Sequence, residues 1–112
     1  MRAKQLVETF HERFARGDAD AIYEDADSDF QQKVPVERHR RYIAMAAESY
    51  GTPGPCDRSV TSVKWDMSGR RIMIQCFAVF SRGAVEEDIV WRKQEGQYRL
   101  HTYKVDWIEH RI

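Results

Sequence analysis

The spacing of apolar residues changes from a helical period to a strand period about halfway along this 112-residue chain. In residues 2–16 the apolar side chains recur at steps of three and four, which indicates one face of an amphipathic helix. From Ser59 onward the period is two, the repeat of a strand with one face buried. Helices first and strands afterwards predict an α+β fold rather than an alternating parallel one.

The first half of the chain predicts three helices. Gly17 ends the first, and Asp18 can cap the second, which is expected over residues 19–26. Pro35 stands in the first turn of the third, which extends to about Tyr50. These helices are short enough to pack together on one side of a sheet.

The second half predicts four antiparallel strands. Tight turns are expected at residues 68–69, 82–83 and 95–96, because each of these pairs ends in glycine. In the last strand the apolar residues change phase near His101 and Thr102, which predicts a β-bulge there. A bulge bends a sheet, so we expect the three helices to pack in the concave face of a curved four-stranded sheet, giving a cone-shaped domain.

Charge and composition exclude several classes of protein. Lys plus Arg equals Asp plus Glu, 18 of each, so no net field attracts the chain to nucleic acid or to an anionic membrane. No window approaches the ~20 apolar residues of a membrane span. The first residues show no secretory signal, so as written we expect a cytoplasmic protein, or a periplasmic or exported one if a leader has been removed. The length suits one domain, residues 1–112.

Two cysteines are too few for a disulfide framework, and Cys56 and Cys76 lack the spacing of a zinc or redox motif. Cys76 lies in an apolar strand and is expected to be a small core residue. Cys56 lies in a loop rich in proline and glycine and is expected to be a free or loosely packed thiol. A bridge between them is left open, without support from the sequence. Neither a metal nor a cofactor is expected.

Four segments carry a family resemblance: GDADAIYEDA, FQQKVPVERHRRYI, FAVFSRGAVEEDIVW and EGQYRLHTYKV. Through them the chain resembles, over nearly its whole length, the nuclear-transport-factor-2-like (cystatin-like, SnoaL-like) superfamily, and within it a small bacterial family of unknown function. Glu87 matches a glutamate that follows a turn in the family's penultimate strand, whereas Thr102 stands where the family usually has glycine. The resemblance implies a cone-shaped fold with a pocket between helices and sheet. It implies no reaction, because relatives include isomerases, polyketide cyclases, ligand binders and protein-interaction modules.

The segment IYEDADSDF holds three alternating aspartates, Asp25, Asp27 and Asp29. An EF-hand loop that began at Asp25 would need glycine at its sixth position and glutamate at its twelfth, where this chain has Phe30 and Val36. We therefore expect the aspartates to end the second helix and start a turn, with Phe30 entering the core. A general base for isomerase chemistry is the alternative.

A second candidate set is Glu87, His101 and Tyr103, on neighbouring strands. A carboxylate beside an imidazole in an apolar pocket is a setting for acid–base chemistry. If the protein is an enzyme, these three are the expected catalytic residues. The preferred interpretation is that Glu87 pairs with a surface cation and that His101 is exposed at the bulge. The residues expected to line the pocket are Tyr23, Phe30, Tyr42, Phe77, Glu87, His101 and Tyr103.

Two further patterns concern the surface. The basic run RHRR, residues 38–41, is expected to be a solvated helix face, because no aromatic residues are interleaved with it. Residues 72–80 are apolar on both faces of their strand. Together with three tryptophans, they exceed what three short helices can cover, which predicts a homodimer through the outer face of the sheet.

The sequence therefore favours a domain that binds a small apolar ligand or a partner protein and has no assembled catalytic motif. The alternative is a ketosteroid-isomerase-like or dehydratase-like enzyme that uses a pocket carboxylate with His and Tyr partners. A buried carboxylate within hydrogen-bond reach of a histidine or tyrosine, next to an apolar pocket, would favour the enzyme.

Overall fold

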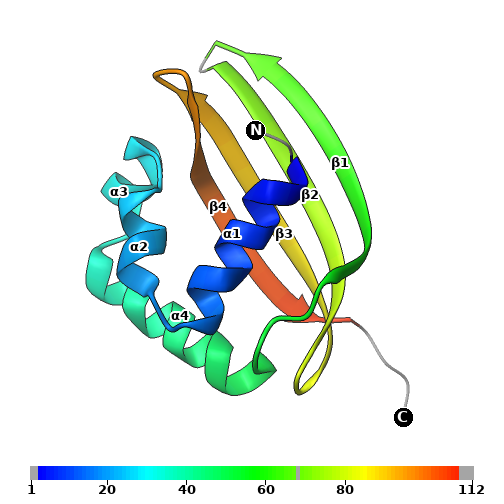
Figure 1. Cartoon of the computed structure of the whole chain (residues 1–112). Coiled ribbons are helices and arrows are strands. Elements are labelled where there is room, and N and C mark those ends of the chain that lie inside the picture. Colours follow the sequence, from blue (N-terminus) through cyan, green and yellow to red (C-terminus); the bar gives the residue numbers. More distant parts are fainter. Residues whose placement is uncertain (1–2, 68, 109–112) are drawn as a thin grey trace.

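A computed structural model describes residues 3–67 and 69–108, within which four helices precede four strands (Figure 1). The helices are α1 (Ala3–Ala15), α2 (Ala19–Glu24), α3 (Ser28–Lys33) and α4 (Val36–Tyr50), and the strands are β1 (Cys56–Asp66), β2 (Gly69–Phe80), β3 (Gly83–Gln94) and β4 (Gln97–Trp107). The predicted α+β fold is confirmed. In this part of the chain, no helix has the length and apolarity needed to cross a bilayer.

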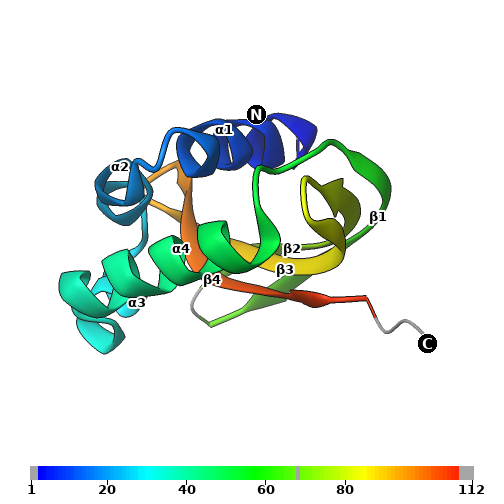
Figure 2. The same cartoon turned by 90° about the horizontal axis from the view of Figure 1, so that it is seen from below.

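The strands form one antiparallel sheet in the order β1-β2-β3-β4. Helix α1 lies across one face of this sheet, whereas α2, α3 and α4 gather beside β4 (Figure 1). Seen from below, α1 forms a layer of its own on that side of the sheet (Figure 2). We call the face toward α1 the inner face and the opposite one the outer face.

The turn at residues 95–96 is confirmed, whereas the turn predicted at residues 82–83 lies one residue earlier, at Ser81 and Arg82, because Gly83 already pairs with Phe80. Glu95 and Gly96 both have positive φ, 53° and 81°, which is the backbone that a two-residue hairpin loop requires. Asp18 caps α2, because its side chain accepts from Ala21 N at 3.1 Å. Ser68, half of the first predicted turn, lies outside the described residues.

The predicted bulge is confirmed. Trp91 pairs with Leu100 and Val90 pairs with Thr102, so His101 is the extra residue in β4. The shift returns the apolar side chains of β4 to the inner face on both sides of the bulge.

The segment of alternating aspartates starts a helix as well as ending one, so the expected number of helices was wrong. Helix α2 stops at Glu24 rather than Ala26, and Asp27 then caps a further helix, α3, by accepting from Phe30 N at 2.8 Å. Aspartate is disfavoured inside a helix but preferred at an N-cap, and both properties act here. Asp27 N also donates to Leu100 O at 2.8 Å, which ties the turn between α2 and α3 to β4.

The core lies between α1 and the inner face. Even-numbered side chains of β2 from Ile72 to Phe80 are buried, whereas Met73 and Val79, on the outer face, are 40% and 57% exposed. Strand β1 extends past α1 (Figure 1) and is exposed along almost its whole length, with Trp65 at 74%. The described chain therefore leaves the outer face of β2 without the cover that its apolar pattern predicts.

Cys56 and Cys76 form a disulfide between β1 and β2. The expectation of a free thiol at Cys56 was therefore wrong. A register shift between Cys56 and Arg58 brings the first residue of β1 beside Cys76, which pairs with Ser59. The separation of the two cysteines in the sequence could not show this, because the bridge depends on the register of the two strands.

Candidate functional site

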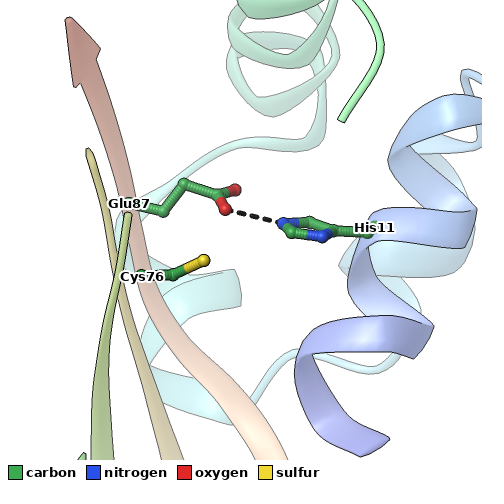
Figure 3. Close-up of side chains that lie close together, drawn as sticks. All are labelled: His11, Cys76 and Glu87. Carbon is green, nitrogen blue, oxygen red and sulfur yellow. Dashed lines mark hydrogen bonds and ion pairs between the residues drawn. The ribbon is translucent and has the colours of Figure 1, made fainter. Parts of the chain in front are cut away.

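Glu87, on β3, is the centre of the candidate site. Its side chain is fully buried, and it alternates with Val85, Ile89 and Trp91 on the inner face. The carboxylate points away from the sheet toward His11 on α1 (Figure 3). The expected pairing of Glu87 with a surface cation was wrong. A buried carboxylate must be matched by hydrogen-bond donors, and Glu87 has two.

Each oxygen of Glu87 has one short contact. His11 Nε2 lies 2.6 Å from Oε1, and the Tyr103 hydroxyl donates to Oε2 at 2.6 Å. Burial raises the pKa of the Tyr103 phenol well above its usual value, and the charge of Glu87 raises it further. The phenol therefore stays protonated and donates. Phenol, carboxylate and imidazole form one connected network from β4 through β3 to α1.

His11 was not among the residues predicted for the site. Its position carried a signal, however, because it lies four residues after Val7 and three before Phe14, both buried. A polar side chain on the buried stripe of a helix must find a polar partner, and the packing of α1 on the sheet supplies Glu87.

His101 belongs to a second, separate cluster. Its Nδ1 lies 2.7 Å from Asp27 Oδ2, and Arg92 Nε lies 2.9 Å from the same oxygen. Asp27 is fully buried, and the side chain of His101 is only 13% exposed, so the expected exposure of His101 was wrong. The suggested approach of Glu87 and His101 does not occur, because the two residues contact different partners.

The other two aspartates of the alternating segment face outward. Asp25 is 44% exposed and pairs with Arg13 at 3.3 Å. Asp29 is 40% exposed and pairs with Arg92 at 3.2 Å. Of the three, Asp27 alone points inward, and it is occupied in capping α3 and neutralising Arg92.

An apolar cavity of about 200 Å³ lies between α1, α3, α4 and β4. It is lined by Phe10, Phe30, Val34, Arg38, His39, Tyr42, Ile43 and Tyr103. Tyr103 links this cavity to the buried network, because its ring forms part of the wall while its hydroxyl reaches Glu87. A larger trough of about 410 Å³ between α1 and the β3–β4 hairpin contains several charged side chains and is more polar.

The pocket candidates from the sequence divide by position. Phe30, Tyr42 and Tyr103 line the apolar cavity. Tyr23 lies behind it, with its ring centroid 6.0 Å from that of Phe30. Phe77 lies on the outer face, where the guanidinium of Arg58 is 4.6 Å from its ring centroid.

The basic run on α4, residues 38–41, contains both an exposed and a buried side chain. Arg40 is exposed and pairs with Asp20 at 2.8 Å, as a solvated helix face should. His39 instead faces inward, is 3% exposed, and has its Nε2 3.0 Å from Ala19 O. The run is therefore interrupted by a core residue that also lines the apolar cavity.

Comparison with models of known protein families gave no match, and no curated protein was found to be similar to this sequence. What the chain does must therefore follow from its own geometry. Two features are candidates for a function. The apolar cavity could bind a ligand, and the buried network of Glu87, Tyr103 and His11 next to it could transfer protons.

Proposed function

We propose that this domain binds a small, mostly apolar molecule in the cavity between α1, α3, α4 and β4. The observation that carries this proposal is the wall, which is aromatic and aliphatic apart from a few polar groups. Small-molecule sites combine these features, an apolar lining with a few polar groups that fix orientation. An apolar cavity of about 150 Å³ accommodates benzene. The 200 Å³ here suits a molecule of one ring or a short branched chain.

A polar group of the ligand would meet Tyr42. The Tyr42 hydroxyl accepts from Val105 N at 3.3 Å, which leaves its own O–H able to donate. Burial raises the pKa of Tyr42, so the phenol is a neutral donor at physiological pH. The Tyr103 hydroxyl is already occupied by Glu87. We therefore expect a ligand with one acceptor, such as a carbonyl or ether oxygen.

A thermal-shift screen with small cyclic ketones, ethers and phenols tests this proposal, because a ligand of the native state raises the melting temperature. Val34→Phe fills the edge of the cavity and should abolish the shift. Val79→Phe, on the outer face, is the matched control and should retain it. A panel that leaves the wild-type melting temperature unchanged, or a shift that survives Val34→Phe, contradicts the proposal.

A second candidate function is proton transfer on a bound carbonyl compound, as in an isomerase or dehydratase. The observation that favours it is a buried carboxylate, Glu87, in contact with both an imidazole and a phenol beside an apolar cavity. A substrate proton would reach Glu87 through the hydroxyl of Tyr103. NMR in D₂O distinguishes the two functions. If the protein is an enzyme, it exchanges the α-hydrogens of the ligand for deuterium, and the Glu87→Gln variant does not. A binding protein exchanges none of them.

We further propose that the chain is a nuclear-transport-factor-2-like domain that forms a homodimer. The helices-then-meander order and the bulge in β4 support the family, and the exposed apolar side chains of the outer face support the dimer. Val60, Met73 and Val79 there are 52%, 40% and 57% exposed. Light scattering at ~10 μM, within the range of moderate affinities, should give a dimeric mass that Val79→Glu converts to a monomeric one. A monomeric wild type contradicts the dimer.

The redox state of the bridge between Cys56 and Cys76 in cells would indicate the compartment in which the protein works. The cytoplasm keeps thiols reduced, and a disulfide there is usually redox-responsive, whereas exported proteins keep theirs closed. We propose the cytoplasm, because Cys76 lies beside a histidine and a glutamate, and a reduced Cys76 could bind a metal ion together with them. Alkylation of free thiols in intact cells tests this: modified cysteines support the cytoplasm, and protected ones support the exported alternative.

A further inference from the structure

Three side chains from three elements project into one small space behind the groove between α1 and β1. His11 comes from α1, Cys76 from β2 and Glu87 from β3, and the sulfur of Cys76 lies beside the contact between the other two (Figure 3). One ligand atom of each lies within 4.8 Å of those of the other two. Cys56 adds a fourth, because its Sγ is bonded to Sγ of Cys76.

We propose that the reduced protein binds a zinc-type divalent cation through Cys56, Cys76, His11 and Glu87. Two thiolates, an imidazole and a carboxylate are ligands that Zn²⁺ accepts in tetrahedral sites. Zinc–ligand bonds of about 2.0–2.3 Å place neighbouring tetrahedral ligands about 3.3–3.8 Å apart. His11, Cys76 and Glu87 reach this spacing by small rotations, since their ligand atoms already lie within 4.8 Å of one another. Cys56, whose sulfur is bonded to that of Cys76, joins them by rotating away from Cys76 once the bridge is open. Thiolate ligands favour zinc over magnesium or calcium.

The bridge and the metal are alternative states of the same atoms. With the bridge closed, both sulfurs are bonded to each other, and His11 Nε2 lies only 2.6 Å from Glu87 Oε1. A dithiol reductant gives two electrons to the bridge and is itself oxidised to a disulfide, while each cysteine sulfur takes up one proton. The incoming cation then displaces both thiol protons to water. His11 and Glu87 separate to admit it.

The surroundings suit a metal ligand set. Tyr103 donates to the second oxygen of Glu87 at 2.6 Å, which would hold the carboxylate in place while the first oxygen binds the ion. An open groove of about 500 Å³ between α1 and β1, lined in part by His11 and Cys56, gives access from solvent. This groove lies beside β1 and the apolar cavity lies beside β4, so metal binding can be tested apart from ligand binding, although Tyr103 belongs to both sites.

Cobalt(II) titration of the full chain tests the proposal, because tetrahedral thiolate-bound cobalt absorbs strongly in the visible and near ultraviolet. The protein is reduced, and the reductant is removed under anaerobic conditions. This reduced protein should develop the bands, and the oxidised protein should not. His11→Ala should weaken cobalt affinity by about 100-fold or more. His101→Ala, which removes the histidine of the other acidic cluster, Asp27 and Asp29, is the matched control and should leave the affinity unchanged. Zinc should displace the cobalt and abolish the bands.

A second measurement tests metal binding even if reduction of the bridge unfolds the chain. Circular dichroism before and after metal addition would then show recovery of the native spectrum, since a structural metal contributes its binding free energy to folding. Cys56→Ala, which cannot form the bridge, keeps three ligands and should bind cobalt more weakly, with less intense thiolate bands. Absence of thiolate bands in the reduced protein, or an affinity that His11→Ala leaves unchanged, overturns the proposal.

Discussion

His11 Nε2 on α1 lies 2.6 Å from Glu87 Oε1 on β3, although the two residues are 76 positions apart. The contact is a polar link between α1 and the sheet, and aromatic rings lie beside it. The His11 ring meets that of Phe80 edge-on at 5.8 Å, and the Phe10 ring lies 4.4 Å from that of Tyr103. Apolar rings lower the local dielectric and strengthen the polar contacts beside them. Substitutions of these residues should therefore have large effects on the free energy of unfolding.

Tyr103→Phe should lower the free energy of unfolding by about 2–3 kcal/mol. The change leaves the ring in place but removes the hydroxyl that donates to the fully buried Glu87, and hydrogen bonds to charged groups are the costly ones to lose. Urea denaturation followed by tryptophan fluorescence measures the difference.

Tyr98→Phe is the matched control for that variant. The Tyr98 hydroxyl is buried without a hydrogen-bond partner among the described residues, so its removal should change stability by less than about 0.5 kcal/mol or increase it. Equal losses for Tyr98→Phe and Tyr103→Phe would show that ring packing, rather than the bond to Glu87, determines the effect.

The fold was largely predictable because local signals agreed with each other. The change of period separated helices from strands, and the phase shift at His101 located the bulge. The fourth helix was missed because Asp27 was interpreted as a residue that ends one helix and starts a turn. The same side chain is also a strong N-cap, and which role dominates depends on whether Phe30 and its neighbours can continue as a helix after it.

The site was less predictable because it is built from contacts between distant elements. Glu87 and Tyr103 were named from the sequence, but His11 was not, and the partner suggested for Glu87 was His101. Glu87 shares its strand parity with Val85 and Ile89, which are buried, but this signal was not used, and the sequence could not show which helix crosses above it. The disulfide was left open for the same reason, since Cys56 reaches Cys76 only through a register shift.

Reduction of the bridge in the presence of a chelator should destabilise the protein by about 3 kcal/mol, because the closed loop restricts the unfolded chain. The two cysteines are separated by 20 positions. Urea midpoints with and without reductant give the value. The double variant Cys56→Ala with Cys76→Ala should respond to neither oxidation nor reduction. A wild type whose midpoint is also insensitive to reductant would contradict the prediction.

Stability should fall as the pH drops below about 6.5, in part because of His39. Burial is the main cause that lowers the pKa of His39 below its ordinary 6.5, against the opposing effects of the Ala19 carbonyl and Asp20. The unfolded chain therefore binds a proton at a higher pH than the native one. The stabilisation is complete above 6.5 and is lost as the pH falls through the native pKa, at up to about 1.4 kcal/mol per pH unit.

His39→Gln tests this origin, since an amide can still donate to Ala19 O but does not titrate. Melting temperatures measured between about pH 7.5 and pH 5.5, which bracket the ordinary histidine pKa, should fall more for the wild type than for the variant. Parallel curves for the two proteins would assign the pH dependence to other groups.

Asp27→Asn should destabilise the protein by about 3 kcal/mol. The carboxylate of Asp27 is fully buried between Arg92 and His101, and breaking a buried ion pair leaves the remaining charge without its partner. Asparagine caps helices as well as aspartate does, so α3 keeps its N-cap and the loss reports the charge alone. Asp27→Ala should lose about 1 kcal/mol more, because it also removes the cap.

Asp29→Asn is the control: Asp29 pairs with the same Arg92 but is 40% exposed, and its loss should stay below about 1 kcal/mol. Urea unfolding of the three variants orders them, and similar losses for Asp27→Asn and Asp29→Asn would show that burial of the pair has no special effect.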